Sequence, residues 1–263
     1  PFQFDKFGQM WIADFMHGPK LYAGRKKRKS YLHVIIDDCS RYVVSGRFCP
    51  SESTQSLIVE LMTAVRRHGI AQRLYSDNGS AYNSRHLKIV CANLSMQQPH
   101  TPARRPQGRS KVERFFRTVR EQFLARQKYK TFDAINTAFI QYLNDYHHRI
   151  HSTLQCSPMQ KRLSVDSVCK HVPEVADIES LFRLKRRCRV YNDQTIRLHK
   201  KAFEVPGCLP GGRITVYYMP WDLCRVYYGE DLKLAKPVDL TANAYRFDNA
   251  NFAHTKETNH DTE

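Results

Sequence analysis

The spacing of apolar residues predicts that the first half of the chain alternates between strands and helices. Apolar and β-branched runs bounded by turn residues are typical of strands, and we expect them at residues 8–14, 31–38, 41–48, 72–77 and 95–98. Only a Cys-Ser turn separates the second run from the third, which indicates a hairpin. We expect the basic run GRKKRK, which follows the first strand, to form a turn or hairpin loop.

Helical periodicity predicts four longer elements between these strands and after them. They lie at residues 51–69, 84–94, 111–127 and 131–151. The first opens with a cluster of Ser, Glu and Thr that suits a helix N-terminus, and it ends at Gly69. Strands that alternate with helices in this way are typical of an α/β domain.

The pattern changes after Pro158, and this change predicts a second domain. We expect an α/β domain at residues 1–155, a linker with short helices at 156–180, a small all-β barrel at 181–240 and a disordered tail at 241–263. In the barrel, the pairs Tyr217-Tyr218 and Tyr227-Tyr228 should each place one ring in the core, because alternate strand residues face opposite sides. Base stacking by these tyrosines is the alternative.

The net charge of the chain indicates which class of molecule it binds. The chain has a formal net charge of +17, which is typical of a protein that binds a polyanion such as nucleic acid, although a basic protein without such a partner is the alternative. No apolar run reaches membrane-spanning length, so we expect no membrane partner. The eight cysteines form no C-x-x-C pair, which favours reduced thiols and a cytoplasmic location.

Three carboxylates stand where phosphodiester chemistry would need them. Asp14 is expected at the end of the first strand, Asp77 at the end of a later strand, and Glu113 in the first turns of a helix, with 35 residues between Asp77 and Glu113. Converging carboxylates can hold two divalent cations, which activate a nucleophile and stabilise a leaving oxygen. Taken singly, each has an ordinary explanation, because aspartate is common in turns and glutamate near helix N-termini.

Five motifs in order resemble one family. MWIADF, IIDDCSRYVV, YSDNGS, GRSKVERFFRTV and NDYHHRIHSTLQCSPMQ are similar to the motifs of D,D-35-E transposases and retroviral-type integrases, over residues ~8–163. The resemblance implies an RNase H-like mixed five-stranded sheet with flanking helices. The later β-rich segment is similar to the small barrel of Mu-like and TniA/TnsB-like transposases, and insertion-sequence transposases share the core.

The resemblance also implies an activity. It identifies Asp14, Asp77 and Glu113 as the catalytic residues and as ligands of two Mg²⁺ (or Mn²⁺) ions. The implied reaction is nicking at the 3′ ends of a transposon and transfer of those ends into target DNA. A homo-oligomer on DNA, an AAA+ ATPase partner and association with the bacterial nucleoid are further expectations. The alternatives are an RNase H-like nuclease and a non-catalytic DNA-binding assembly protein derived from a transposase.

Basic and polar residues around the third carboxylate are candidate DNA contacts. We expect phosphate contacts from Asn78, Arg104, Arg105, Arg109, Lys111, Arg114 and Arg117. The alternative is a solvated basic face, with Asn78 serving only in a turn.

Two other groups of residues could be taken for metal ligands. Asp37 and Asp38 end one expected strand at the turn to the next, beside Ser40 and Arg41, which favours a role in the turn and in a salt bridge. His147, His148 and His151 have a spacing that could bind zinc, but no Cys or Glu stands nearby at metal-site spacing, which favours a structural or DNA-facing role.

Overall fold

The computed structural model describes residues 4–76, 84–98, 109–172 and 177–239. These residues form two compact units, of which the first ends at Phe182 and the second begins at Arg183. The expected tail at residues 241–263 lies outside the described residues, and the division of the chain into four parts stays a prediction. No helix among the described residues is long and apolar enough to cross a membrane.

The first unit is built on a mixed sheet. In hydrogen-bonded order, its strands are β5 (Val43–Cys49), β4 (Tyr31–Asp37), β1 (Trp11–His17) and β6 (Leu74–Ser76). β4 is antiparallel to both of its neighbours, whereas β6 is parallel to β1. The strand expected at residues 95–98 is a single bridge between Gln97 and Arg73, so the described sheet has four strands and not five.

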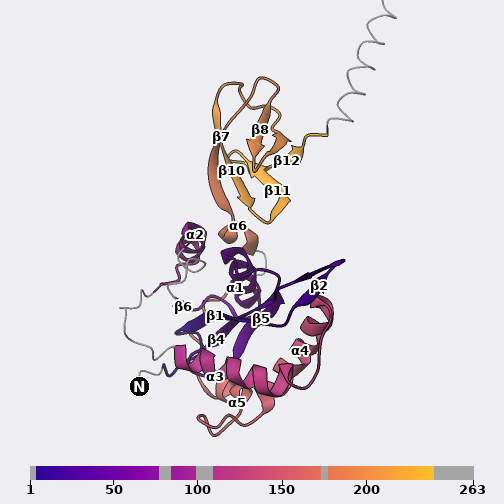
Figure 1. Ribbon diagram of the computed structural model, residues 1–263. Helices are drawn as coiled ribbons and strands as arrows, with labels where there is room; N and C mark the ends of the chain where they lie inside the picture. Colours follow the sequence, from indigo (N-terminus) through magenta and orange to yellow (C-terminus); the bar gives the residue numbers. More distant parts are fainter. Residues whose placement is uncertain (1–3, 77–83, 99–108, 173–176, 240–263) are drawn as a thin grey trace, which may run out of the picture. The chain divides into compact units, whose positions relative to one another are not determined.

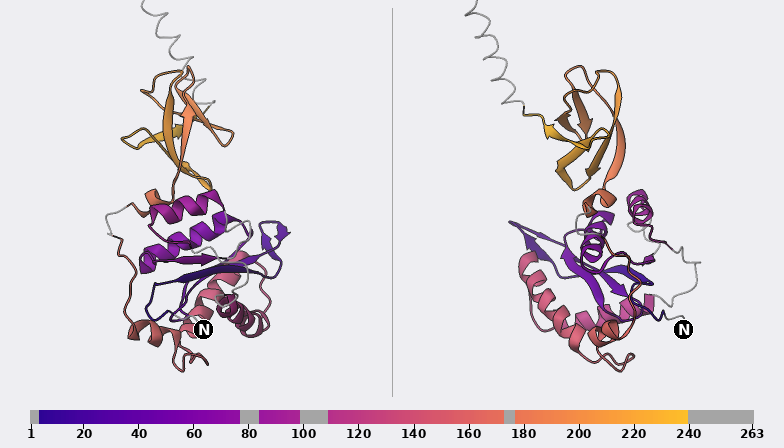
Figure 2. Two further views of the ribbon diagram at one scale, coloured as in Figure 1. Left: turned by 90° about the vertical axis from the view of Figure 1, so that its left-hand side faces the viewer. Right: turned by 180° about the vertical axis from the view of Figure 1, so that it is seen from behind.

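Helices cover both faces of this sheet, as Figures 1 and 2 show. On one face, α1 packs against β4 and β5 and contacts two further helices. These are α1 (Thr54–His68), α2 (Arg85–Asn93) and α6 (Ile178–Phe182). On the other face, α3 packs against β1, and α4 packs against β5 and α5. These helices are α3 (Arg109–Val119), the π-helical η1 (Arg120–Leu124), α4 (Phe132–His148) and α5 (Pro158–Ser164).

Helix α1 begins and ends close to the residues that the sequence indicates. The Ser53 side chain accepts a hydrogen bond from the Ser56 amide, which satisfies one of the unpaired amides at the helix N-terminus. Gly69 follows the last turn with φ of +80°, a conformation that glycine adopts without strain. A Cβ at Gly69 would also lie 2.7 Å from the Lys170 carbonyl oxygen, so both backbone angle and space favour glycine here.

The third expected helix is not a regular α-helix throughout. The sequence predicts one helix at residues 111–127, but α3 passes into the π-helical turn η1, where the Ala125 amide donates to the Arg120 carbonyl at 3.1 Å. A π-turn holds one residue more than an α-turn. Apolar periodicity does not reveal it, because Val119 and Phe123 have the spacing of an α-helical face and both are buried.

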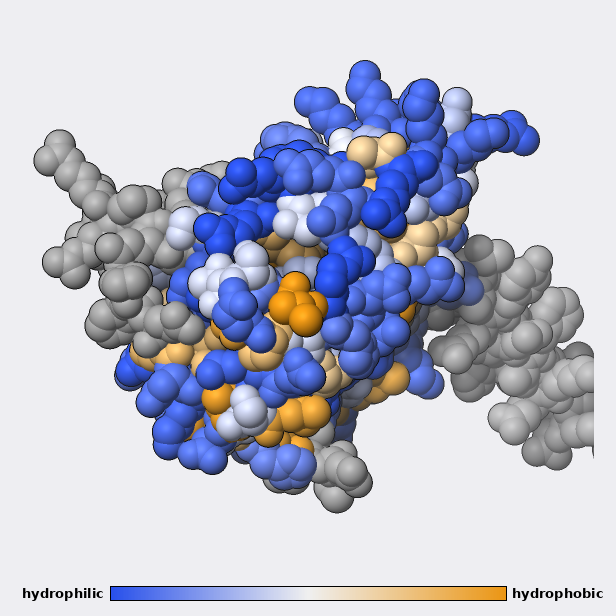
Figure 3. All heavy atoms as spheres, turned by 90° about the horizontal axis from the view of Figure 1, so that it is seen from below, coloured by the Kyte–Doolittle hydropathy of each residue, from blue (hydrophilic) through white to orange (hydrophobic). Residues whose placement is uncertain are grey.

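A basic hairpin leaves the sheet after β1. It consists of β2 (Leu21–Ala23) and β3 (Lys26–Arg28), with Gly24 in the turn at φ of +61°. The run GRKKRK therefore lies in a hairpin, as expected. The surface of the unit on the side of α3 and α5 is predominantly hydrophilic, with hydrophobic residues in small patches (Figure 3).

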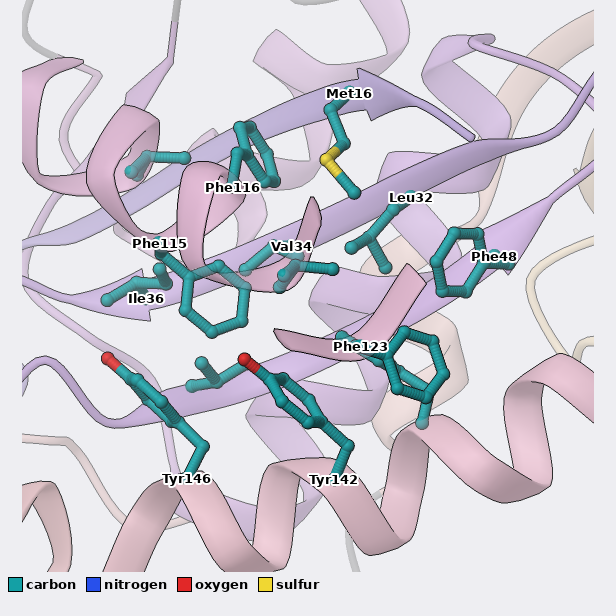
Figure 4. Close-up of a cluster of buried hydrophobic side chains, with 14 of the residues drawn as sticks. Met16, Leu32, Val34, Ile36, Phe48, Phe115, Phe116, Phe123, Tyr142 and Tyr146 are labelled. Carbon is teal, nitrogen blue, oxygen red and sulfur yellow. The ribbon is translucent and has the colours of Figure 1, made fainter. Parts of the chain in front are cut away.

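The main core lies between the sheet and the helices α3 and α4. Figure 4 shows Phe115 and Phe116 of α3 and Phe123 of η1 next to sheet residues such as Leu32, Val34 and Ile36, with Tyr142 and Tyr146 projecting from α4 toward them. Aromatic rings fill much of this space, and their pairs include both edge-to-face and stacked arrangements, which aromatic quadrupoles favour. This packing fixes α3 against β1, and α3 carries one of the candidate catalytic residues.

The second unit is an antiparallel six-stranded sheet that curls into a nearly closed barrel. Its order is β7-β10-β11-β12-β9-β8, and the strands are β7 (Leu184–Arg189), β8 (Thr195–Leu198), β9 (Lys201–Glu204), β10 (Arg213–Met219), β11 (Asp222–Tyr228) and β12 (Lys233–Pro237). Tyr218 and Tyr228 are buried in its core, whereas Tyr217 and Tyr227 are not, which confirms the expected alternation.

His147 of α4 is a buried structural side chain. Its ring stacks on Tyr42 with centroids 3.8 Å apart, and its Nε2 accepts a hydrogen bond from the Val43 amide at 3.2 Å. The accepted bond requires the neutral ring. Burial, together with the charges of His148, Arg162 and His68, lowers the pKa of His147 to about 3.

This pKa predicts that the protein loses stability in acid. In the unfolded chain, His147 binds a proton near the ordinary histidine pKa of 6.5. In the folded chain it does so only near pH 3, so the free energy of unfolding falls as the pH drops from about 6.5 toward 3. We expect a slope of about 1.4 kcal/mol per pH unit for this group. Urea unfolding at several pH values gives the free energy of unfolding as a function of pH. In His147→Gln, the slope of this dependence should be smaller, by the amount that corresponds to uptake of about one proton on unfolding. The exposed neighbour offers a control, and an equal change in His148→Gln would contradict the assignment.

Candidate active site

Asp14 lies in the middle of β1 and not at its end. The sequence predicts a strand at residues 8–14, but β1 begins at Trp11 and continues to His17, because the register with β4 is unbroken from Trp11 to His17. The half-buried Asp14 accepts a hydrogen bond from the Phe15 amide at 2.8 Å. β1 therefore supplies Asp14 from a rigid central strand of the sheet.

The pairing of β1 with β6 ends one residue before Asp14. The parallel pairs are Trp11 with Leu74, Ile12 with Tyr75 and Ala13 with Ser76. The last pair directly precedes Asp14 on one strand and position 77 on the other. Asp77 and Asn78 themselves lie outside the described residues.

Glu113 is an exposed residue in the first half of α3. Its neighbours Val112 and Phe116 are buried in the core cluster with Ile12 and Met16 of β1, so the helix is anchored on the strand that carries Asp14. Glu113 thus projects from a fixed helix.

An ion pair ties the start of α3 to the turn between β4 and β5. The Lys111 Nζ lies 2.6 Å from Asp38 Oδ1, and the Asp38 side chain is 1% exposed. Asp37 holds the same turn by accepting hydrogen bonds from the Gly8 amide and from the amide and hydroxyl of Ser40. Burial of Asp37 raises its pKa, and these hydrogen bonds oppose the shift. Asp37 and Asp38 have the turn and salt-bridge roles that the sequence favours.

The candidate DNA contacts fall into three groups. Lys111 points its ammonium group at Asp38, and Arg114 donates to the Thr153 hydroxyl at 2.7 Å, so both have protein partners. Arg117 is exposed and lies about one turn beyond Glu113. Arg104, Arg105 and the side chain of Arg109 lie outside the described residues.

Sequence reasoning missed Arg41. This residue adopts φ of 60°, its side chain is buried at 6% exposure, and it lines a cavity beside α3. It stands in the run IIDDCSRYVV, which the sequence analysis used only as a family motif. The signal available was a charged residue at the start of a strand predicted to be apolar, beside a tight turn.

The described residues contain no group of three His, Cys, Asp or Glu side chains that could hold a metal ion. Asp77, one of the three expected metal ligands, lies outside the described residues. Two of the histidines weighed as zinc ligands make other bonds, because His147 Nε2 accepts the Val43 amide and His151 Nδ1 accepts the Thr153 amide.

Comparisons with known proteins agree with this fold. Residues 5–106 match the family model described as the integrase core domain. The transposase for transposon Tn552 of Staphylococcus aureus is 27% identical over 233 residues, which cover 77% of this chain and 48% of that protein. The Gag-Pro-Pol polyprotein of Sheep pulmonary adenomatosis virus is 32% identical over 119 residues, which cover 45% of this chain and 6% of the polyprotein.

A solved structure shows the same fold over both units. The cryoEM structure of the simian T-cell lymphotropic virus intasome in complex with PP2A regulatory subunit B56 gamma matches with a TM-score of 0.52 and 18% identity, and the match covers 90% of this chain and 81% of that one. The mixed sheet with helices on both faces is therefore RNase H-like. Residues 5–106 thus resemble the integrase core domain, and the transposase for transposon Tn552 is similar over a longer stretch that covers 77% of this chain.

Proposed function

We propose that this protein is a DNA transposase that nicks the 3′ ends of a transposon and joins them to target DNA. One observation carries the proposal: β1 and β6 run parallel in a register that ends at Ala13 and Ser76, directly before Asp14 and position 77, and α3 brings Glu113 to the same strand. This arrangement supports Asp14 and Glu113 as two members of the triad expected from the sequence, and Asp77 is proposed as the third. The Tn552 transposase, of which the chain spans about half, supports the class of reaction.

The residues present fit a divalent cation of the Mg²⁺ type. Asp14 and Glu113 offer carboxylate oxygens, which are the ligands that Mg²⁺ and Mn²⁺ prefer. Asp14 is half-buried on a strand, and Glu113 is exposed on a helix. A metal ion from solvent could therefore reach Glu113 and be coordinated by both carboxylates. We propose that two ions bind between them and Asp77. When bound, such ions lower the pKa of an attacking water and stabilise the leaving oxygen.

The residues of the chain would position the DNA for two successive displacements. In the first, the oxygen of water forms a bond to phosphorus and the bond from phosphorus to the 3′ oxygen breaks, which leaves a 3′-hydroxyl and a 5′-phosphate. In the second, that hydroxyl attacks a target phosphodiester and a target 3′-hydroxyl leaves. Each strand-transfer step replaces one phosphodiester by another, so no external energy source is required. Arg117, one turn beyond Glu113, would contact the DNA backbone beside the reacting phosphate.

Assembly on DNA is part of the proposal. A protein that joins two ends must hold both at once, and we propose that copies of this chain form a homo-oligomer on the paired ends. An AAA+ ATPase partner is proposed from the resemblance to Mu-like transposases. The net charge of +17 supports tight contact with the DNA backbone.

The test is a strand-transfer assay with the whole protein, an oligonucleotide that carries the transposon end, and a supercoiled target. We expect joined product in the presence of Mg²⁺ or Mn²⁺, and none after chelation with EDTA. Hydrolysis of RNA–DNA hybrids without any joined product would favour the nuclease alternative. Tight DNA binding without metal-dependent cleavage would favour the non-catalytic assembly protein.

A further inference from the structure

A basic cavity lies beside α3, between that helix, the end of α4 and the segment that follows α4. Its volume is about 480 Å³, and its floor is apolar, formed in part by Ile36, Phe115 and Tyr146. Figure 4 shows these three side chains next to one another at one end of the core. Five basic side chains line the cavity: Arg41, Lys111, Arg114, Arg149 and His151.

Arg41 is the buried charged residue of this cavity. Its side chain is 94% buried, given a relative exposure of 6%, and its Nη1 makes no hydrogen bond to any residue that the structure describes. A buried guanidinium nitrogen without an acceptor is costly, since the group loses water and gains no partner. An anion in the cavity would supply the missing acceptor.

The backbone holds Arg41 in place. Its φ of 60° lies in the left-handed region, which is uncommon for a residue other than glycine and marks a constrained position. The Tyr146 hydroxyl donates a hydrogen bond to the Arg41 carbonyl at 3.2 Å, and the Arg41 amide donates to the Asp37 carbonyl at 3.0 Å. The guanidinium is therefore presented from a rigid turn.

The electrostatics of the cavity favour an anion. Among the described residues that line it, none carries a carboxylate. The pKa of His151 is lowered by burial and by the positive charges of Arg41 and Arg114. Two carboxylates lie outside the lining: Asp38 pairs with Lys111, and both Asp38 and Asp37 act electrostatically on Arg41, so they offset part of the positive charge. Hydroxyl groups of Ser110, Thr118, Ser152 and Thr153 add hydrogen-bonding capacity.

We propose that this cavity binds a phosphate group of the DNA backbone, with Arg41 as the central ligand. Guanidinium groups match the geometry of phosphate oxygens better than other side chains do. Successive residues of a helix differ by about 100° in direction, so Ser110, Arg114 and Thr118 share one side of α3 while Glu113 and Arg117 share the adjacent side. The cavity is thus separate from the candidate catalytic residues, and a DNA strand that crosses α3 would reach both. The inference rests on the proposed function only for the source of the phosphate.

The test measures binding and not catalysis. We expect a short oligonucleotide to bind Arg41→Gln about tenfold more weakly than wild type at constant salt, the effect of losing one charge-assisted hydrogen bond. The slope of log K against log salt should fall by about 0.7–0.9, the value for one phosphate contact. Arg149→Gln changes an exposed residue of the same cavity and should weaken binding in the same direction, even if Arg41→Gln folds poorly. Arg126→Gln removes one exposed charge elsewhere and is the matched control.

Side-chain NMR signals of arginine Nε–Hε groups identify the site directly. The Arg41 signal should shift on titration with the oligonucleotide, and more weakly with inorganic phosphate, since a backbone phosphate arrives with neighbouring contacts. A shift with inorganic phosphate alone would assign the cavity to a free phosphate and overturn the DNA assignment. Binding of an acidic peptide with unchanged oligonucleotide affinity in Arg41→Gln would assign it to a protein partner instead. Loss of strand transfer in Glu113→Gln with no Arg41 response would overturn this inference while leaving the proposed function intact.

Discussion

Replacing Asp14 by Asn, or Glu113 by Gln, should abolish strand transfer while leaving the fold intact. Each change removes a negative charge from the proposed metal site and keeps the shape of the side chain. Metal ions contribute several kcal/mol of transition-state stabilisation in such reactions, so we expect a loss of roughly three orders of magnitude or more in rate. Neither residue lies in the buried core, so unfolding curves should overlay that of wild type. Gel assays of nicked and joined products at fixed Mg²⁺ give the measurement.

A matched control comes from the same helical segment. Glu121 is an exposed carboxylate in η1, two turns beyond Glu113, and Glu121→Gln should retain strand transfer within about twofold. DNA affinity without metal should be unchanged in the Asp14 and Glu113 variants, which separates chemistry from binding. Wild-type rates in either variant would remove that residue from the active site.

Local sequence signals predicted the elements of the first unit well. α1 carries its N-cap at Ser53 and its terminal Gly69, and α4 has an uninterrupted apolar face, so each element is specified by its own residues. The order of Asp14, Asp77 and Glu113 was also visible. The apolar run predicts a strand that ends at Asp14, whereas β1 continues to His17 through its pairing with β4. The end of a strand depends on its partner, and a single run of sequence does not contain that partner.

The features that sequence analysis missed are those set by contacts across the chain. β12 contains a single buried residue, Ala235, between exposed lysines, so it shows no alternation and forms because β11 and β9 offer hydrogen bonds on both sides. The partner of Lys111 is 73 residues away in sequence. The environment of Arg41 likewise combines a turn, α3 and the segment after α4. No periodicity within one element reveals such arrangements.

Lys111→Met should destabilise the protein by about 3–5 kcal/mol, because it leaves the Asp38 carboxylate buried without its cation. The pair has an N–O distance of 2.6 Å, and the Lys111 and Asp38 side chains are 15% and 1% exposed. The second Asp38 oxygen accepts only one weaker bond that the structure records, from the Phe4 amide at 3.2 Å. Burial lowers the pKa of Lys111, and the hydrogen bond to Asp38 opposes that shift.

A double variant separates the lost pair from the lost side chain. Asp38→Asn combined with Lys111→Met removes both charges, and it should recover most of the stability, since a neutral buried group costs less than an unpaired ion. Lys6→Met is the control: its 3.4 Å pair with Asp166 is exposed on both sides, and its loss should cost less than about 1 kcal/mol. Urea unfolding of wild type, Lys111→Met, Asp38→Asn, the double variant and Lys6→Met gives the five free energies of unfolding that are compared. If the double variant is as unstable as the sum of the single ones, Lys111 and Asp38 act independently, and the ion pair does not fix the start of α3 beneath Glu113.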